Sequence, residues 1–289
     1  MFRAIGLRRH WQQPKLFFIG TLIATVLFSI LIQVQRPWVA SAQIAPGSNK
    51  PREQLPASQV HPLPAILANW SDETTQGDYF SAIEPTPVGY LVWSEFPVQV
   101  FVEPLSAIGN DFEHDRAQSW VDAITQAVQE WSRYLPLEFV DVSETADITI
   151  WRSTPPIQLH TNSPSEATGQ ANEGQADTNQ ANENHLPRIR SAETQYHLFV
   201  DRPVAAPAKL SHRFTIRLTP NQTIDYIQAT ARHEIGHALG IWGHSPVETD
   251  ALYFSQVQNP LPISVRDINT LKQIYQQPTR LGWEILYDR

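Results

Sequence analysis

Cysteine is absent from the sequence, and methionine occurs once, as Met1. Without cysteine no disulfide bond can form, so the folded part of the chain depends on its hydrophobic core for stability. Basic residues are also scarce beyond the N-terminus. Five of the 21 lysines and arginines lie within residues 1–42, which leaves 16 to face all 29 acidic residues. This balance argues against nucleic acid as a partner, because the phosphate backbone attracts basic surfaces.

The length and composition leave room for one globular domain. A chain of 289 residues with 42% hydrophobic and 17% charged residues suits a domain of about 200 residues with appendages. A second full domain does not fit into the remainder.

An apolar run near the N-terminus predicts export. Residues 16–32 contain no charge, and the basic residues that precede them are Arg3, Arg8, Arg9 and Lys15. This pattern is typical of secretory signals, and about 17 residues also reach the lower limit for crossing a bilayer. The small residues Ala40-Ser41-Ala42 predict that residues 1–42 are a signal peptide cleaved after Ala42. The alternative is a retained membrane anchor, and in both cases the rest of the chain is exported.

Three segments lack the periodicity of regular structure. Residues 43–88 are rich in Pro, Gln and Ser in their first part and predict a flexible spacer or N-terminal extension. Residues 160–188 are dominated by polar residues, with Gln-Ala-Asn-Glu occurring at 170–173 and 180–183. We expect a disordered surface insertion there. Residues 278–289 form a tail without a predicted element.

Between the spacer and the tail, residues 89–277 alternate strand and helix patterns. Period-two alternation predicts five strands, within residues 89–102, 137–141, 146–151, 191–200 and 213–218. A helical period predicts a helix from the cap residue Asn110 to Leu135, between the first two strands. A strand, a helix and two strands in this order indicate a sheet with one crossover helix.

Two further helices are predicted near the C-terminal end. Thr219 to Gln222 has the pattern of a capping box, and the buried stripe of the helix that follows is Ile224, Ile227, Ala231, Ile235 and Ala238. The last helix begins at Ser264 and has core spacing as far as Tyr275.

The second of these three helices carries the pattern His233-Glu234-Ile235-Gly236-His237. Histidines four residues apart project from one face of a helix, so both imidazoles can bind one zinc ion at about 2.0–2.1 Å. The adjacent Glu234 carboxylate has the chemistry of a general base toward a water molecule that the metal makes acidic.

The residues after this pattern favour a third ligand. Gly240 and Gly243 are residues that adopt a left-handed turn at little cost, and a turn is needed to return the chain to the metal. His244 follows that turn. His197 and His212 lack ligand spacing, and we interpret both as polar strand histidines.

The stretch from His233 to Ser245 resembles the signature of the metzincin zinc peptidases, most closely the matrixins: H-E-x-x-H-x-x-G-x-x-H followed by Ser. The third histidine of that signature falls on Gly243 here, and His244 comes one residue late. We therefore predict His244 as the third ligand, with Asp250 as the fallback.

A second departure concerns the Met-turn of that family, the turn that places a methionine beneath the three histidines. Asp250-Ala251-Leu252-Tyr253-Phe254 stands at this place, and Leu252 replaces the methionine. Leu and Met have similar volumes, so the exchange is tolerated in packing. The cysteine switch that keeps animal matrixins latent cannot exist in this chain.

The resemblance implies an α+β metzincin-like fold: a twisted mixed five-stranded sheet, an active-site helix, and a small C-terminal subdomain that ends in a helix. It implies a zinc endopeptidase with one catalytic zinc on His233, His237 and His244, and Glu234 as the general base. Structural calcium or a second zinc is not predicted. The substrate is an extended polypeptide bound along the edge strand 191–200, with Tyr196 and Tyr253 as candidate contacts.

Two alternatives stay open. A thermolysin-like zincin would use a distant glutamate such as Glu248 as its third ligand, and an exported zinc-binding module would keep the fold without turnover. In each case we expect a monomer that contacts membrane only through its N-terminal segment.

Overall fold

The computed structural model describes residues 53–105, 111–156, 168–170 and 190–287. Contacts divide the chain into residues 1–49 and 50–289, and the fold concerns the second unit. The predicted signal or anchor, the cap residue Asn110 and most of the predicted insertion lie outside the described residues. Among the described helices, none combines the length and the apolar character needed to cross a membrane.

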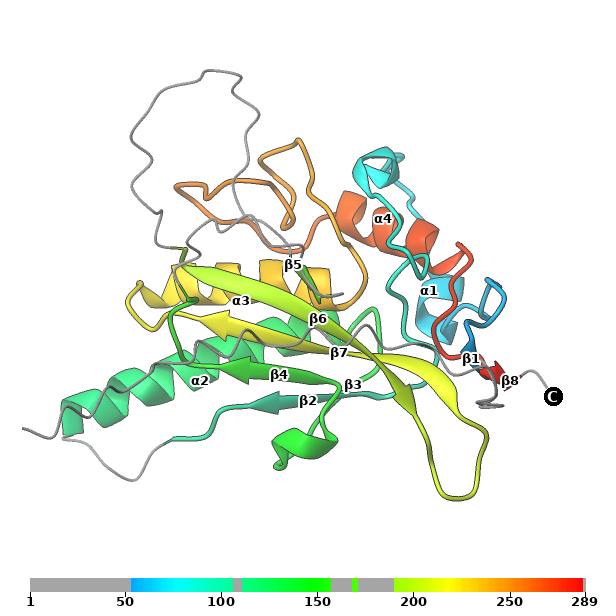
Figure 1. The fold of residues 1–289 in the computed structure, drawn as a ribbon. Helices are drawn as coiled ribbons and strands as arrows, with labels where there is room; N and C mark the ends of the chain where they lie inside the picture. Colours follow the sequence, from blue (N-terminus) through cyan, green and yellow to red (C-terminus); the bar gives the residue numbers. More distant parts are fainter. Residues whose placement is uncertain (1–52, 106–110, 157–167, 171–189, 288–289) are drawn as a thin grey trace, which may run out of the picture. The chain divides into compact units, whose positions relative to one another are not determined.

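The described part of the chain forms an α+β fold around one mixed sheet (Figure 1). Its strands stand in the order β3-β2-β4-β7-β6-β5. Strands β2, β3, β4 and β7 are parallel, and β6 pairs antiparallel with both β7 and β5. Their bounds are β2 (Val98–Val102), β3 (Leu137–Phe139), β4 (Ile148–Trp151), β5 (Thr168–Gln170), β6 (Ala192–Asp201) and β7 (Lys209–Leu218). The predicted fold class and all five predicted strands are confirmed.

Strand β5 is an addition to the prediction. It lies inside the range 160–188, for which we expected disorder, and it pairs with the centre of β6 at Gln195–His197. The prediction that β6 is the edge strand is therefore wrong, because β5 occupies the outer position. A three-residue strand of polar and glycine residues gives no periodic signal in the sequence.

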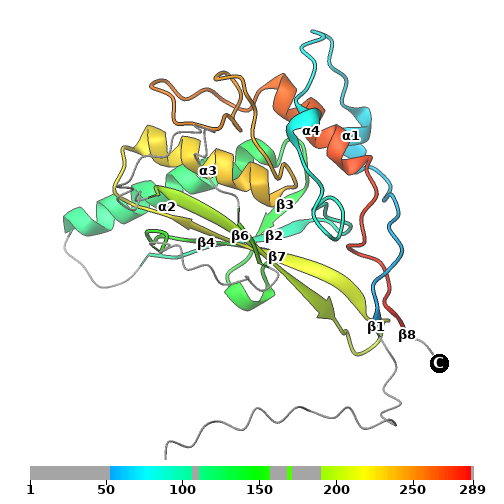
Figure 2. The same ribbon diagram turned by 45° about the horizontal axis from the view of Figure 1, so that its top comes forward.

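Two long helices lie side by side on one face of the sheet (Figures 1 and 2). Helix α2 (Asp111–Trp131) joins β2 to its parallel neighbour β3, and α3 (Ile224–Ala238) follows β7. The indole Nε1 of Trp131 donates a 2.8 Å hydrogen bond to the carbonyl of Arg232 and so ties the two helices together. The inward side chains of β4 and β7 complete this core: Ile148, Ile150, Phe214, Ile216 and Leu218.

Helix ends were predicted less well than helix faces. Helix α2 ends at Trp131 rather than Leu135, and α3 begins at Ile224, after an N-cap, Thr223, that makes no side-chain capping bond. The capping box predicted at Thr219 does not form, since this hydroxyl accepts a 3.4 Å bond from Asn221 N before the helix begins.

The other predicted helix features can be checked directly. Four of the five stripe residues of α3 are buried, but Ile224 is 44% exposed because it begins the first turn. The last helix, predicted to begin at Ser264, is α4 (Val265–Tyr275), and Ser264 is its N-cap and forms a complete capping box with Asp267.

The N-terminal extension is folded where the structure describes it. Residues up to 88 were predicted to be a flexible spacer, but from residue 53 they contain α1 (Ala65–Asn69) and the 3-10 helix η1 (Phe80–Ala82). Leu67, Tyr79, Ile83 and Val88 are buried in the main core. The spacer prediction is wrong for this part, because isolated apolar residues between prolines pack one by one and show no period.

The C-terminal tail is also folded, against that extension. Strand β1 (Glu53–Gln54) pairs antiparallel with β8 (Leu286–Tyr287). Gln59 and Thr279 exchange two backbone hydrogen bonds of 2.9 Å, and His61 stacks on Trp283 with ring centroids 4.2 Å apart. The range 278–289, for which no element was predicted, thus belongs to the domain through residue 287.

One buried histidine makes the fold sensitive to acid. His212 on β7 is 4% exposed and stacks on Trp93 at a centroid distance of 4.0 Å. Its Nε2 has no hydrogen-bond partner within the described chain. Burial lowers the pKa of His212 to about 3, so the ring is neutral in the folded protein at neutral pH.

We expect this histidine to weaken the fold between pH 6.5 and about 3. In that window the unfolded chain binds a proton that the folded chain rejects, so stability falls by up to about 1.4 kcal/mol per pH unit as the pH decreases. In urea unfolding at pH 7.5 and pH 5, His212→Phe should lose less stability than the wild type. His197→Phe, on the exposed side of β6, is the control and should keep the wild-type slope. Equal slopes for all three proteins would contradict the assignment.

Candidate metal centre

Helix α3 presents the two predicted histidines and Glu234 from its last two turns. Ile227, Ala231 and Ile235 anchor the helix in the core. His233 and His237 are one turn apart and are both buried, and their Nε2 atoms lie 3.0 Å from each other. The spacing seen in the sequence therefore brings two imidazole nitrogens to one point.

The turn after α3 has the hydrogen bonds of a Schellman motif. Gly240 N donates to His237 O and Ile241 N donates to Gly236 O, each at 3.1 Å. Gly240 has φ +121°, a conformation that glycine adopts without a Cβ penalty. This turn ends the helix and sends the chain back toward the histidines, as predicted for Gly240.

Gly243 has a different role from the one predicted. Its φ is not positive, so it does not make the left-handed turn. A Cβ at this position would lie 2.8 Å from Ala82 O and 2.9 Å from the Ile83 side chain. Glycine is needed here because the N-terminal segment approaches closely, and Ile83 and Gly243 form an antiparallel bridge.

His244 joins the first two histidines despite the additional residue. Its ring centroid is 5.2 Å from that of His233 and 4.9 Å from that of His237. One nitrogen from each ring falls within a group whose atoms all lie within 4.8 Å of one another. Within the described residues, this is the one group of three or more metal-ligand side chains.

Backbone carbonyls orient two of the rings. His233 Nδ1 donates to Ala251 O at 2.8 Å, and His237 Nδ1 donates to Ile241 O at 2.7 Å. A carbonyl can only accept, so these bonds place the proton on Nδ1 and turn the Nε2 lone pair toward the centre. In the part of the chain described, the buried Nε2 of His244 has no hydrogen-bond partner.

Burial keeps the rings of His237 and His244 in the neutral form that binds metal. It lowers the pKa of His237 well below the usual value, with His233 and His244 adding to the shift and the bond to Ile241 opposing it. Burial and then His233 lower the pKa of His244 to about 3. Neutral imidazoles with converging lone pairs fit a zinc ion, for which tetrahedral ligand nitrogens lie about 3.3 Å apart.

Glu234 is fully buried beside the histidines and is held by β6. The Thr194 hydroxyl donates to Glu234 Oε2 and also lies 3.3 Å from the carbonyl oxygen of Glu234. Sequence reasoning missed Thr194, which comes 40 residues earlier on a strand and has no spacing relation to the motif. The Thr194 hydroxyl fixes the position of Oε2. The orientation of the whole carboxylate, including Oε1, is thereby defined.

The fallback ligand Asp250 is engaged elsewhere. Its carboxylate accepts bonds from Ser245 Oγ and Ser264 Oγ and pairs with Arg266 Nε at 3.0 Å. Glu248, the ligand considered for a thermolysin-like site, is exposed and is not part of the histidine group. The structure therefore assembles the histidines without either carboxylate.

Leu252 lies where a floor residue was predicted. It is fully buried, and a Cβ on Gly236 would come within 2.6 Å of its Cδ2 atom. Gly236 stands between the two helix histidines in sequence, so Leu252 packs directly against that part of α3. Trp131 closes the same contact from α2, 3.0 Å from the position of such a Cβ.

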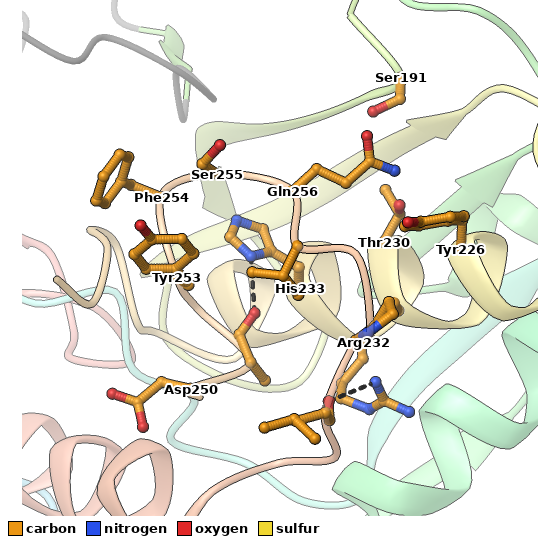
Figure 3. A pocket seen from close by; sticks show the side chains of 15 residues that line it. Ser191, Tyr226, Thr230, Arg232, His233, Asp250, Tyr253, Phe254, Ser255 and Gln256 are labelled. Atoms are coloured by element: carbon orange, nitrogen blue, oxygen red, sulfur yellow. Dashed lines mark hydrogen bonds between the residues drawn. The ribbon is translucent and has the colours of Figure 1, made fainter. Parts of the chain in front are cut away.

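A pocket of about 190 Å³ opens beside His233 (Figure 3). Tyr253 contributes to its lining, together with Tyr226 and Thr230 from α3 and the segment 254–257. Tyr196, the other predicted substrate contact, does not line this pocket. It is 7% exposed and packs edge-on against Trp242 at 5.1 Å.

An unpredicted ion pair supports the pocket wall. Arg232 binds Glu130 of α2 through Nε and Nη2. Its Nη1 donates to Leu261 O at 2.9 Å, the bond drawn as a dashed line at Arg232 in Figure 3. This guanidinium joins α2, α3 and the loop that lines the pocket. Nothing in the sequence pairs residue 130 with residue 232, since the contact depends on how the two helices pack.

Comparison with known proteins agrees with this geometry. The family model of the matrixins matches residues 107–276, which is more than half of the chain. A search of the curated proteins finds no match. The matched range includes the sheet from α2 onward, the three histidines and α4. The chain belongs to the matrixin family of metallopeptidases.

Proposed function

We propose that this protein is a zinc-dependent endopeptidase in which His233, His237 and His244 hold the metal and Glu234 is the general base. The observation that carries the proposal is the convergence of three imidazole nitrogens, with His233 lining a pocket and the buried Glu234 next to it in the chain. Family membership supports a metallopeptidase in general, and the geometry supports this assignment of residues.

When bound, zinc supplies a Lewis acid that polarises the peptide carbonyl and makes a water molecule acidic at neutral pH. With the metal bound, Glu234 would accept a proton from the attacking water on Oε1, while Thr194 holds Oε2. The water oxygen forms a bond to the carbonyl carbon, and the bond from that carbon to the amide nitrogen breaks. Glu234 returns the proton to the leaving amine, so it begins and ends the cycle as a carboxylate.

The substrate is an extended polypeptide. Ser191, just before β6, and residues 253–257 both line the pocket, and the peptide runs between them with one side chain in the pocket. Tyr253 contacts that side chain. Strand β5 pairs with the centre of β6. The substrate can therefore pair with β6 as an additional strand only where β5 does not.

The protein acts outside the cytoplasm as a monomer. The apolar run at residues 16–32 with its basic flank supports export, and the lack of cysteine means that no thiol in the chain can hold it latent. If Ala42 ends a signal peptide, N-terminal sequencing of the exported protein should begin at Gln43. An N-terminus at Met1 in the membrane fraction would instead identify the anchor.

Glu234→Gln should separate metal binding from catalysis. The amide has the size of the carboxylate but cannot take the proton, so kcat on a labelled unfolded protein should fall by roughly 10²- to 10⁴-fold. The variant should still bind one equivalent of zinc. If the wild type binds zinc at one equivalent but cleaves no unfolded protein, a binding module replaces the peptidase.

His244→Ala should abolish tight zinc binding, because two imidazoles remain of three. Metal content after dialysis against a weak chelator measures this directly. His197→Ala is the matched control, since His197 is an exposed histidine outside the group and its removal should leave one zinc bound. Unchanged metal content in His244→Ala would show that another side chain is the third ligand.

A further inference from the structure

A path of hydrogen bonds leads from the metal centre to the N-terminal extension. The ring of His233 donates to Ala251 O, and Ala251 N donates to Asp267 Oδ2 at 2.9 Å. The hydroxyl of Tyr79 donates to the other oxygen, Asp267 Oδ1, at 2.6 Å. Tyr79 lies outside the range matched by the matrixin family, and its side chain is two groups away from a proposed ligand.

Asp267 is the centre of this path. It is fully buried, and its oxygens also accept bonds from Ser264 N at 2.7 Å and Leu252 N at 3.4 Å. Burial raises the pKa of Asp267. Hydrogen bonds oppose this shift, and the bond from Tyr79 lowers the pKa more than any other. A buried carboxylate needs its donors, and removing one changes the geometry of those that remain.

Tyr79 is held firmly in its place. It is 3% exposed, its backbone N donates to Thr270 Oγ1 at 3.0 Å, and the Arg266 guanidinium lies over its ring at 5.9 Å. The residues before it are fixed on α4 as well, where Asn269 donates to Gly77 O at 2.7 Å. The hydroxyl therefore reaches Asp267 from a segment with little freedom to move.

The same segment touches the other end of the ligand set. Four residues after Tyr79, Ile83 forms a bridge with Gly243, the residue directly before His244. The segment 79–83 thus contacts the supports of the first and the third proposed ligands. Tyr79 makes the first contact, with Asp267, and Ile83 makes the second, with Gly243.

We propose that Tyr79 is a positioning residue for the metal centre, acting through Asp267 and the backbone of Ala251 on the ring of His233. The inference rests on the proposed function, because it assigns Tyr79 to the same site. Outer partners of metal-bound histidines set the ring orientation and so the affinity. The N-terminal extension then supports the metal centre through Tyr79.

The test compares Tyr79→Phe with Tyr275→Phe in the full chain. Each variant removes one hydroxyl from a tyrosine that is 3% exposed. The Tyr275 hydroxyl donates to the carbonyl of Leu239, the C-cap residue of α3, at 3.1 Å and accepts a 3.4 Å bond from Trp93 N, and neither bond involves Asp267. The zinc dissociation constant, measured by competition with a chromophoric chelator, and the urea midpoint of the metal-free protein are compared with the wild type.

We expect Tyr79→Phe to weaken zinc binding roughly 3- to 10-fold, less than the loss of a direct partner of a ligand, and Tyr275→Phe to stay within about 2-fold of the wild type. In an Asp267→Asn background, Tyr79→Phe should add less than about 2-fold, because the path is already broken. Wild-type affinity in Tyr79→Phe, or equal losses in both tyrosine variants, would overturn the inference. Failure of the proposed function would appear in the wild type itself, as no zinc bound or no peptide cleaved.

Discussion

The site depends on the turn that ends α3. If the helix continued, His244 would lie seven residues beyond His237, about 10.5 Å further along the axis, and could not share a ligand group with it. Gly240 prevents this by adopting φ +121°. A side chain at this position would also meet Leu91 O at 2.9 Å, so the backbone conformation and the close packing both require glycine. The carbonyl of Ile241, in this turn, then accepts the bond that orients His237.

A second constraint follows from gathering three imidazoles in a buried place. Charged rings would repel each other there, and burial holds His237 and His244 neutral. Two Nε2 lone pairs at 3.0 Å also repel, unless a cation or a proton lies between them. The backbone carbonyls of Ala251 and Ile241 hold the two rings in this arrangement, and a metal ion bound between them would stabilise the folded state. The site is thus shaped for a positive ion before one arrives.

The additional residue before His244 is accommodated by packing that comes from outside the family match. Gly243 accepts the close approach of Ala82 O, and Ile83 pairs with it. Beyond the turn, Ser245 N donates to Leu252 O at 2.7 Å, and Ser245 Oγ binds Asp250. The segment that carries His244 is therefore held both before and after this residue. The position of His244 does not depend on the spacing within the motif alone.

The candidate site and most of the helices and strands could be predicted from the sequence alone. Histidines at 233 and 237 share a helical face whatever the rest of the chain does, because the helix repeat fixes their geometry. The alternation in β4 and β7 gave their buried faces in the same way. Leu252 was placed by its position after the motif, and its contact with Gly236 agrees with that placement.

Tertiary structure decided the contacts that have no period. Thr194 reaches Glu234, Arg232 reaches Glu130, and Tyr79 reaches Asp267 across separations of 40, 102 and 188 residues. Such pairs depend on how the helices and the N-terminal segment pack. A residue pattern records which face of an element is buried, but not which distant polar group will meet it there. For this reason one stretch of sequence was enough to name the three histidines that the structure brings together, while the groups that hold them in place could not be named from it.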